Sequence, residues 1–296
     1  MLEPFGFLNI DKAAGMTSHD VVAKLRRGLK LKKVGHAGTL DPMATGVLIV
    51  CIGAATRLSE YVMSHRKRYR ATIHLGIETD TYDADGEITR QVDTSHITRQ
   101  QIETDLLQFT GDLQQMPPAY SAIKQGGRKL YELARAGQAV ELLPRPVSIF
   151  ALQIVEWTLP TFTLDVECSA GTYIRSLAFD LGRVLGTGAH LSGLIRLASG
   201  KFQQSDAVTL DQVLASKDWT KYVVEPHQVL ADWPRVDLTP AEERDILFGR
   251  RIEQRNTVGA EQLCLAYSHS SKQLIAVMQA HDGWLQPHKV FSLGDT

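Results

Sequence analysis

The stretch GHAGTLDPMATG, residues 35–46, places a single carboxylate, Asp41, in a loop of glycines and small residues. Glycine lets a backbone approach a ligand closely and adopt conformations that are closed to other residues, which would leave Asp41 free to project into a cleft. The alternative is that Asp41 caps a helix beginning at Pro42, because Asp at the N-cap and Pro at the first helical position are both favoured. The loop chemistry alone favours the cap, and both interpretations stay open at this point.

The segments around this loop alternate between strand and helix patterns. Residues 5–12 (FGFLNIDK) predict a strand, and residues 17–31 predict a helix whose capping signature is Thr17 with Asp20. The continuous apolar run 46–53 (GVLIVCIG) predicts a buried strand, and 55–63 predicts a helix. Residues 67–76 alternate cleanly between apolar and polar, which is typical of a strand with one solvated face. Residues 98–111 predict an amphipathic helix ending at Gly111.

The second half of the chain contains further strand patterns and two proline pairs that interrupt regular structure. Strands are predicted over 145–159, 162–170 and 189–202, and 172–186 predicts a passage from a strand end into a helix. The segment 117–146, between Pro-Pro and Pro-Arg-Pro, reads as an insertion carrying a short basic helix. A boundary near 230–240 divides a unit of residues 1–232 from one of 233–296, in which 241–252 predicts a helix and 263–268 and 273–285 predict strands. We therefore predict an α+β fold with a mixed or antiparallel central sheet and a small β-rich C-terminal module.

Composition excludes several classes of protein. The three cysteines, Cys51, Cys168 and Cys264, lie far apart without CxxC or Cys/His spacing, which argues against a disulfide framework or structural zinc. No signal-peptide pattern or membrane-length apolar run is present, so we expect a soluble cytoplasmic protein with no membrane association. Sequence motifs for ATP, dinucleotide, zinc-protease and serine-nucleophile sites are missing.

Charge is unevenly placed along a chain whose net charge is −1. Residues 1–75 hold twelve Lys/Arg against five Asp/Glu, whereas residues 76–116 hold two against nine. Six cations lie on the predicted helix after Thr17 and in the segment that follows it, with no acid among them: Lys24, Arg26, Arg27, Lys30, Lys32 and Lys33. Such a surface is suited to a phosphate backbone, although an ordinary solvated helix face has the same composition.

Taken together, the motifs closely resemble the TruB family of tRNA pseudouridine synthases. The resemblance rests on GHAGTLDPMATG, on KRY at 67–69 and on GTYIR at 171–175, in that order, with support from TDTYDADGEI and GAHLSGLIRLASG. It covers roughly residues 6–210, and the C-terminal unit resembles the family's small PUA-like RNA-binding module more weakly. The resemblance implies isomerisation of the T-loop uridine at position 55 of tRNA to pseudouridine. An isomerisation has neither a redox step nor a group-transfer donor, so we expect no cofactor and no metal.

The resemblance also implies roles for individual residues. Asp41 matches the essential carboxylate, acting as nucleophile or as the group that prompts elimination to a glycal, and Arg175 matches its arginine partner. Tyr69 matches the tyrosine that stacks on the flipped base, with an ordinary core residue as its alternative. The resemblance further places in substrate binding His36, Asp83, Tyr173, Leu194, Lys12 and Lys67. If GTYIR is extended, Tyr173 and Arg175 would point to the same side and line one pocket.

The expected partner is the T stem-loop of tRNA, with no obligate protein partner. The target base must be swung out of its loop into the pocket. The helix from Lys24 to Lys33, the basic run 66–70 and the cations Lys124, Arg128 and Lys129 of the insertion would grip the phosphates. A non-catalytic tRNA-binding or folding module on the same fold is the alternative function. A glycosidase is disfavoured, because it would need a second carboxylate opposite Asp41.

Overall fold

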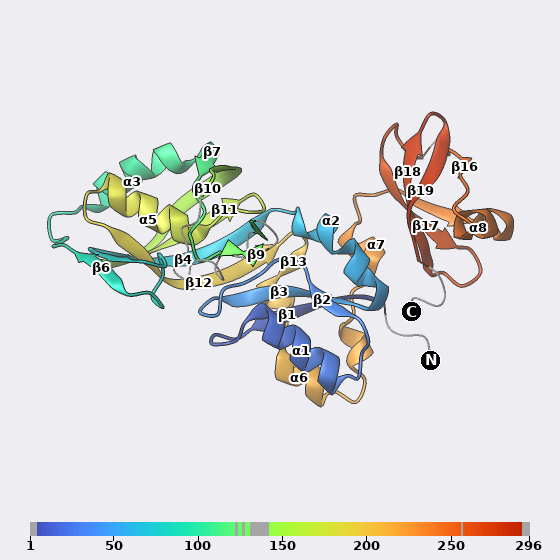
Figure 1. The fold of residues 1–296 in the computed structure, drawn as a ribbon, viewed down its shortest axis with the longest axis horizontal. Coiled ribbons are helices and arrows are strands. Elements are labelled where there is room, and N and C mark those ends of the chain that lie inside the picture. Colours follow the sequence, from blue (N-terminus) through green and yellow to red (C-terminus); the bar gives the residue numbers. More distant parts are fainter. Residues whose placement is uncertain (1–4, 122–123, 126–127, 131–141, 256, 292–296) are drawn as a thin grey trace.

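A ten-stranded mixed sheet organises the larger lobe of the computed structural model, which describes residues 5–121, 124–125, 128–130, 142–255 and 257–291. The strand order is β14-β1-β3-β12-β4-β11-β10-β7, with β2 paired to β3 and β13 to β12 (Figure 1). These strands are β1 (Gly6–Lys12), β2 (Val34–His36), β3 (Thr45–Ile52), β4 (Lys67–Leu75), β7 (Gly111–Gln115), β10 (Arg145–Thr158), β11 (Thr161–Cys168), β12 (Ala189–Ser199), β13 (Phe202–Gln203) and β14 (Val208–Thr209). Parallel pairing joins β1 to β14 and β3 to β12, and the other pairs are antiparallel, which confirms the predicted α+β class.

Helices cover this sheet and connect its strands. They are α1 (Ser18–Gly28), α2 (Ser59–Met63), α3 (Arg99–Leu106), α5 (Ile174–Val184), α6 (Leu210–Ala215) and α7 (Pro226–Val229), with 3₁₀ turns η1 (Gly53–Leu58), η2 (Leu107–Phe109), η3 (Gln204–Asp206) and η4 (Trp219–Tyr222). Two small hairpins pair β5 (Ile77–Thr79) with β6 (Ile88–Gln91), and β8 (Lys124–Gln125) with β9 (Arg128–Lys129). Among the helices of the described segments, none has the length and apolar character needed to cross a membrane.

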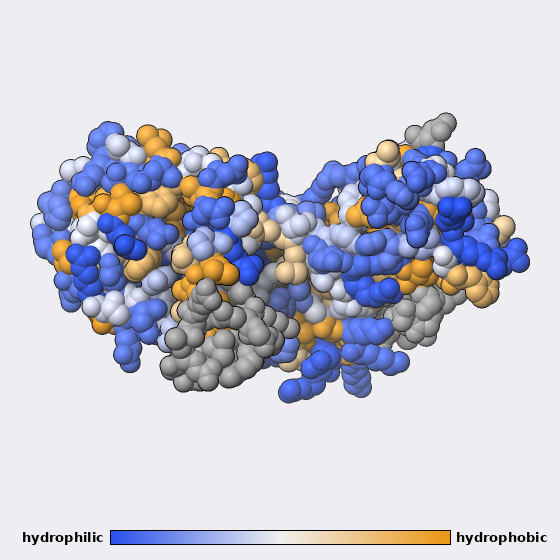
Figure 2. All heavy atoms as spheres, turned by 45° about the horizontal axis from the view of Figure 1, so that its top comes forward, coloured by the Kyte–Doolittle hydropathy of each residue, from blue (hydrophilic) through white to orange (hydrophobic). Residues whose placement is uncertain are grey.

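A second, five-stranded sheet forms the smaller lobe, in the order β15-β17-β18-β19-β16. Its elements are β15 (Arg235–Leu238), α8 (Pro240–Leu247), β16 (Ile252–Glu253), β17 (Leu263–Ser268), β18 (Leu274–His281) and β19 (Trp284–Val290). The two lobes lie at opposite ends of an elongated molecule, and Figure 2 shows a mostly hydrophilic face that is hollowed between them.

Alternation along β1 and β3 explains how the lobes are joined. Leu48 and Val50 of β3 belong to the core under the large sheet, whereas Val47 and Ile49 belong to a second apolar cluster on the other face. That second cluster also contains Leu265, Tyr267, Leu274, Val277 and Phe291 from the smaller lobe. Burial on both faces is the reason that 46–53 reads as an uninterrupted apolar run.

Polar contacts reinforce the junction between the lobes. Lys289 of β19 donates to the carbonyl oxygen of Arg57 at 2.7 Å and forms an ion pair with Glu60. The Arg57 guanidinium donates to the Val290 carbonyl oxygen at 2.6 Å and lies 5.1 Å from the Phe291 ring centroid. The smaller lobe is therefore fixed to η1 and α2 by packing and by hydrogen bonds.

Most predicted elements are present, and the differences have local causes. The helix predicted for 55–63 begins as the 3₁₀ turn η1 before α2, and the helix predicted for 98–111 ends at Leu106, followed by η2. Gly111, with φ +100°, starts β7 instead of ending a helix. The single run predicted for 273–285 is two strands, because Asp282 and Gly283 both take positive φ and turn the chain. The basic helix predicted within 117–146 lies outside the described residues.

Gly46, the last residue of the opening stretch, is required by close packing of β3 on β12. Its φ is +93°, and an added Cβ would lie 2.4 Å from the Arg196 carbonyl oxygen. We expect Gly46→Ala to lower the free energy of unfolding by about 2 kcal/mol or more, measured by urea denaturation.

Gly111→Ala is the matched control for this change. Gly111 has φ +100°, but an added Cβ there meets nothing within 4 Å. Both variants carry the cost of a positive φ, and only Gly46→Ala adds the clash. Equal losses of stability in the two variants would contradict the assigned packing role.

Candidate active site

The loop between β2 and β3 is a turn and contains no helix. Pro42 and Met43 form the turn, and the Ala44 N–H donates to the Asp41 carbonyl oxygen at 3.1 Å. The prediction that Asp41 caps a helix is therefore wrong. The chain enters β3 at Thr45, directly after this turn, which leaves no room for a helix.

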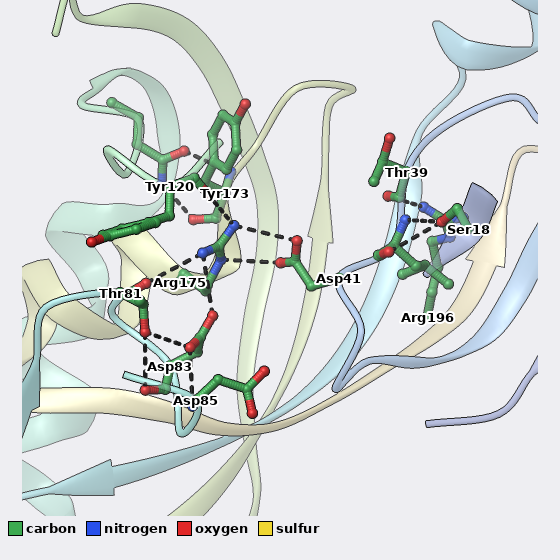
Figure 3. Close-up of polar contacts among 12 residues, drawn as sticks. Ser18, Thr39, Asp41, Thr81, Asp83, Asp85, Tyr120, Tyr173, Arg175 and Arg196 are labelled. Atoms are coloured by element: carbon green, nitrogen blue, oxygen red, sulfur yellow. Dashed lines mark hydrogen bonds and ion pairs between the residues drawn. The ribbon is translucent and has the colours of Figure 1, made fainter. Parts of the chain in front are cut away.

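Side chains from β1 and α1 hold the backbone on either side of Asp41. The Leu40 N–H donates to Ser18 Oγ at 2.8 Å, and the Ser18 hydroxyl donates back to the Leu40 carbonyl at 3.1 Å. On the other side, the Pro42 carbonyl accepts from Lys12 Nζ at 3.2 Å and from the Gly15 N–H at 2.9 Å. The Asp41 backbone is thus fixed by its two neighbours, which leaves its side chain directed toward Arg175 (Figure 3).

Arg175 comes from the first turn of α5, and its guanidinium group faces the Asp41 carboxylate. Nε lies 3.0 Å from Asp41 Oδ2 as an ion pair, and Nη2 donates to Asp41 Oδ1 at 3.3 Å. Because α5 begins at Ile174, the condition of an extended 171–175 segment is not met: Tyr173 is the N-cap and Arg175 is helical. Gln115 explains the early helix start, since its side chain accepts from the Tyr173 N–H at 2.8 Å and donates to the Tyr173 carbonyl at 2.9 Å.

The remaining donors of Arg175 bind groups from two other segments. Nη1 lies 3.2 Å from Asp83 Oδ2 and donates to the Thr81 carbonyl at 3.3 Å. Nη2 donates to the Tyr120 carbonyl at 3.0 Å, at the root of the 117–146 segment. Figure 3 shows the guanidinium plane between Asp41 and Asp83. Contacts with two carboxylates and two backbone carbonyls fix the orientation of the planar guanidinium group.

Exposure distinguishes the two members of this pair. The Asp41 side chain keeps 32% of its surface accessible, whereas Arg175 keeps 7%. A ligand can therefore reach the carboxylate while the cation stays behind it. Burial of the carboxyl group by surrounding protein raises the pKa of Asp41 above its ordinary value, the Arg175 guanidinium acts in the opposite direction, and Asp83 adds to the rise.

Tyr69 and Leu194 lie on the core face of neighbouring strands. Tyr69 of β4 and Leu194 of β12 are both 8% exposed and belong to the main apolar core. Burial raises the pKa of Tyr69, and the Asp41 charge contributes to that rise, so the two side chains lie within electrostatic range. The same holds for Tyr173, whose pKa is raised chiefly by burial and also by Asp41. His36 ends β2, paired with Val50, at the entry to the loop.

Lys12 and Lys67 are placed differently from the prediction that they bind substrate. Both side chains are buried, and burial lowers the pKa of each to about 8. The Lys12 ammonium donates to Ala13 and Met16 as well as Pro42, and the Lys67 ammonium donates to the carbonyl oxygens of Met63 and His65. These amines hold backbone, so they are not directed at an incoming ligand.

Arg196 was missed by the sequence reasoning. It is 1% exposed on β12, and its guanidinium donates to the carbonyls of Val47 at 2.6 Å, Thr39 at 3.3 Å and Gly38 at 3.1 Å. A signal existed in SGLIRLASG, where arginine follows Leu194 at a spacing of two and so shares its inward face.

Comparison of the sequence with known proteins identifies its family. A family model described as "TruB family pseudouridylate synthase (N terminal domain)" matches residues 26–174, and "tRNA pseudouridylate synthase B C-terminal domain" matches 175–234. The chain belongs to the TruB family of pseudouridylate synthases. Asp41 and the GHAGTLDPMATG loop lie within the first matched region, and Arg175 is the first residue of the second.

Relatives in the TruB family match over most of the chain. The protein named tRNA pseudouridine synthase B from Symbiobacterium thermophilum is 48% identical over 82% of this chain and 82% of its own length. The protein of the same name from Dehalococcoides mccartyi strain BAV1 is 42% identical over 97% of this chain and 96% of its own length. Among solved structures, a Cbf5-Nop10-Gar1 complex is similar with TM-score 0.73 and 26% identity, covering 98% of this chain and 85% of the matched chain.

Arg175 and Asp83 should shift the pKa of Asp41 in opposite directions. Asp41 is ionised above its raised pKa and becomes protonated as the pH falls through it. Arg175→Gln removes the opposing cation and should raise the pKa further, whereas Asp83→Asn removes a like charge and should lower it.

These shifts can be measured by ¹³C NMR titration of the Asp41 carboxyl carbon, assigned by its loss in Asp41→Asn. Asp206→Asn, on the η3 turn, serves as a control that should leave the titration unchanged. A shift of the same sign in Arg175→Gln and Asp83→Asn would contradict the electrostatic assignment.

Proposed function

We propose that this protein isomerises a uridine of tRNA to pseudouridine, and that the target is the T-loop uridine at position 55. The names of relatives that match 82–97% of the chain support the tRNA substrate and the reaction. The observation that carries the proposal is an accessible Asp41 carboxylate held 3.0 Å from a buried arginine. The T-loop position rests on the resemblance of the motifs.

The reaction breaks the C1′–N1 glycosidic bond and forms a C1′–C5 bond. The uracil loses a proton from C5 and gains one at N1, so substrate and product are isomers. Positive charge develops at C1′ as the glycosidic bond breaks, and a nearby carboxylate stabilises or traps it. Asp41 serves in its ionised form, either by attacking C1′ or by prompting elimination to a glycal.

Arg175 supports this chemistry from behind the carboxylate. It counteracts the effect of burial on the Asp41 pKa, which keeps more of the carboxylate ionised near neutral pH. It also fixes the carboxylate through two oxygen contacts, so that the group need not reorganise when the sugar arrives. Because Arg175 also binds Asp83 and two backbone carbonyls, its own position is set by three chain segments.

Basic residues near the loop suit the RNA backbone. The cations of α1 and its exit are exposed, and α1 begins at Ser18, which holds Leu40 next to Asp41. Phosphates bound along α1 would therefore lie close to the loop. In the run 66–70, Arg66 is paired with Glu167 at 3.4 Å and Arg70 with Asp165 at 2.8 Å, so these cations offer less free charge than the sequence suggests. The nucleotide enters by being extruded from its loop, and RNA shape dominates recognition.

Asp41→Asn tests the proposal, because it preserves shape and removes the charge. We expect binding of a T-arm stem-loop to stay within about twofold, and pseudouridine formation to fall by at least about 10³-fold. Pseudouridine is mapped at single-nucleotide resolution after incubation with purified protein, and binding is measured by fluorescence anisotropy.

Asp211→Asn, an exposed carboxylate in the first turn of α6, is the control that should keep full activity. Undiminished turnover by Asp41→Asn would refute the assignment. RNA binding by the wild type without any pseudouridine would favour a non-catalytic tRNA-binding module.

A further inference from the structure

Arg196 is a fully buried cation whose donors all serve the active-site framework. At 1% exposure it cannot contact an RNA, and its guanidinium donates to three backbone carbonyls. Two of these, Gly38 and Thr39, belong to the loop that carries Asp41, and the third, Val47, belongs to β3 directly after it. Burying a charge is costly unless its donors are satisfied, so the carbonyl positions and the guanidinium position determine each other.

Strand β12 places Arg196 between β3, which follows the Asp41 loop, and β4, which carries Tyr69. In the strand order β3-β12-β4, the backbone of Arg196 is in register with Gly46 of β3 on one side and with Tyr69 of β4 on the other. The Arg196 guanidinium also lies close enough to Tyr69 to act on its pKa, which it lowers against the larger rise caused by burial.

We propose that Arg196 is a positioning residue that fixes the Asp41 loop relative to Tyr69. Its guanidinium binds the loop carbonyls of Gly38 and Thr39, and its backbone is in register with Tyr69 on the neighbouring strand. The inference rests on the proposed function, in which Asp41 acts at C1′, and on the family resemblance, which implies that Tyr69 stacks on the base. Two groups that act on opposite ends of one nucleotide must be held in register, and misplacement by about 1 Å is enough to cost on the order of 10²-fold in rate.

Two further features limit how the framework can relax when Arg196 is changed. An added Cβ at Gly46 would meet the Arg196 backbone at 2.4 Å, so β3 and β12 are already in close contact. Gly38, whose carbonyl accepts from Nη2, has φ +106°, a conformation that other residues rarely adopt. The loop therefore has little freedom to find new donors for its carbonyls.

The test separates positioning from binding and from folding. Arg196→Lys keeps the charge but loses the planar fork that reaches several acceptors. With a T-arm stem-loop under single-turnover conditions, we expect the rate of pseudouridine formation per bound complex to fall at least about tenfold, while Kd stays within about twofold. Stoichiometric binding titration counts the folded, binding-competent molecules, so the rate is expressed per competent molecule.

Arg90→Lys is the matched control. Arg90 also donates to a backbone carbonyl, that of Gly186 at 3.0 Å, but it does so on β6, away from Asp41. It should keep both rate and Kd within about twofold of the wild type.

A second readout follows Tyr69 directly. The chain contains eight tyrosines, and 3-fluorotyrosine labelling gives each a ¹⁹F resonance, with that of Tyr69 assigned by its loss in Tyr69→Phe. Arg196→Lys should shift the Tyr69 resonance, and Arg90→Lys should not. If Arg196→Lys does not fold, Gly38→Ala perturbs the same carbonyl with Arg196 in place and should show the same loss of rate at unchanged Kd.

Each outcome is decisive. A wild-type rate in folded Arg196→Lys or Gly38→Ala, an unshifted Tyr69 resonance, or a rate that falls only in proportion to binding stoichiometry would overturn the inference. If the wild-type protein forms no pseudouridine, the proposed function fails instead, and the ¹⁹F experiment still reports whether Arg196 holds Tyr69.

Discussion

The structure depends on a carboxylate kept in a place where burial opposes its charge. Asp41 sits in a loop whose surroundings raise its pKa, and the Arg175 guanidinium at 3.0 Å counteracts that effect. Arg175 is almost fully buried, and the carboxylates of Asp41 and Asp83 together compensate its charge. The Asp41 side chain stays 32% accessible, whereas Arg175 is 7% accessible, so a ligand arriving from solvent meets the carboxylate first.

Two buried cations help to hold this part of the molecule together. Lys12 and Arg196 both point inward, and both end on backbone carbonyls of the residues around Asp41. Ala37, Leu40 and Ala44 of the loop pack in the apolar clusters. The two cations bind the carbonyl oxygens of the loop in addition. The accompanying cost is desolvation, which lowers the pKa of Lys12 to about 8.

Local patterns predicted the framework well and the site only in part. The alternation in 67–76 and the capping box of Thr17 with Asp20 are both present, because each depends on neighbours within a few residues. The start of α5 was not predictable, since it is fixed by Gln115, 58 positions away from the residue whose peptide group it binds. The sequence cannot show that the ammonium groups of Lys12 and Lys67 are already surrounded by carbonyl oxygens, so it predicts substrate binding for both. The spacing of two from Leu194 indicates an inward position for Arg196, but the carbonyls that it binds lie about 150 residues away in the sequence.

The junction between the two sheets has a consequence for which RNAs the protein can use. Val47 and Ile49 of β3 pack in the same cluster as Leu265 and Val277, and Lys289 clasps η1 and α2. The strand that emerges from the reactive loop thus carries the smaller lobe on its reverse side without an intervening hinge. The separation between the two lobes is therefore fixed. An RNA that touches both lobes must present the two contacted regions at that separation. The folded shape of the RNA then matters more than its base sequence.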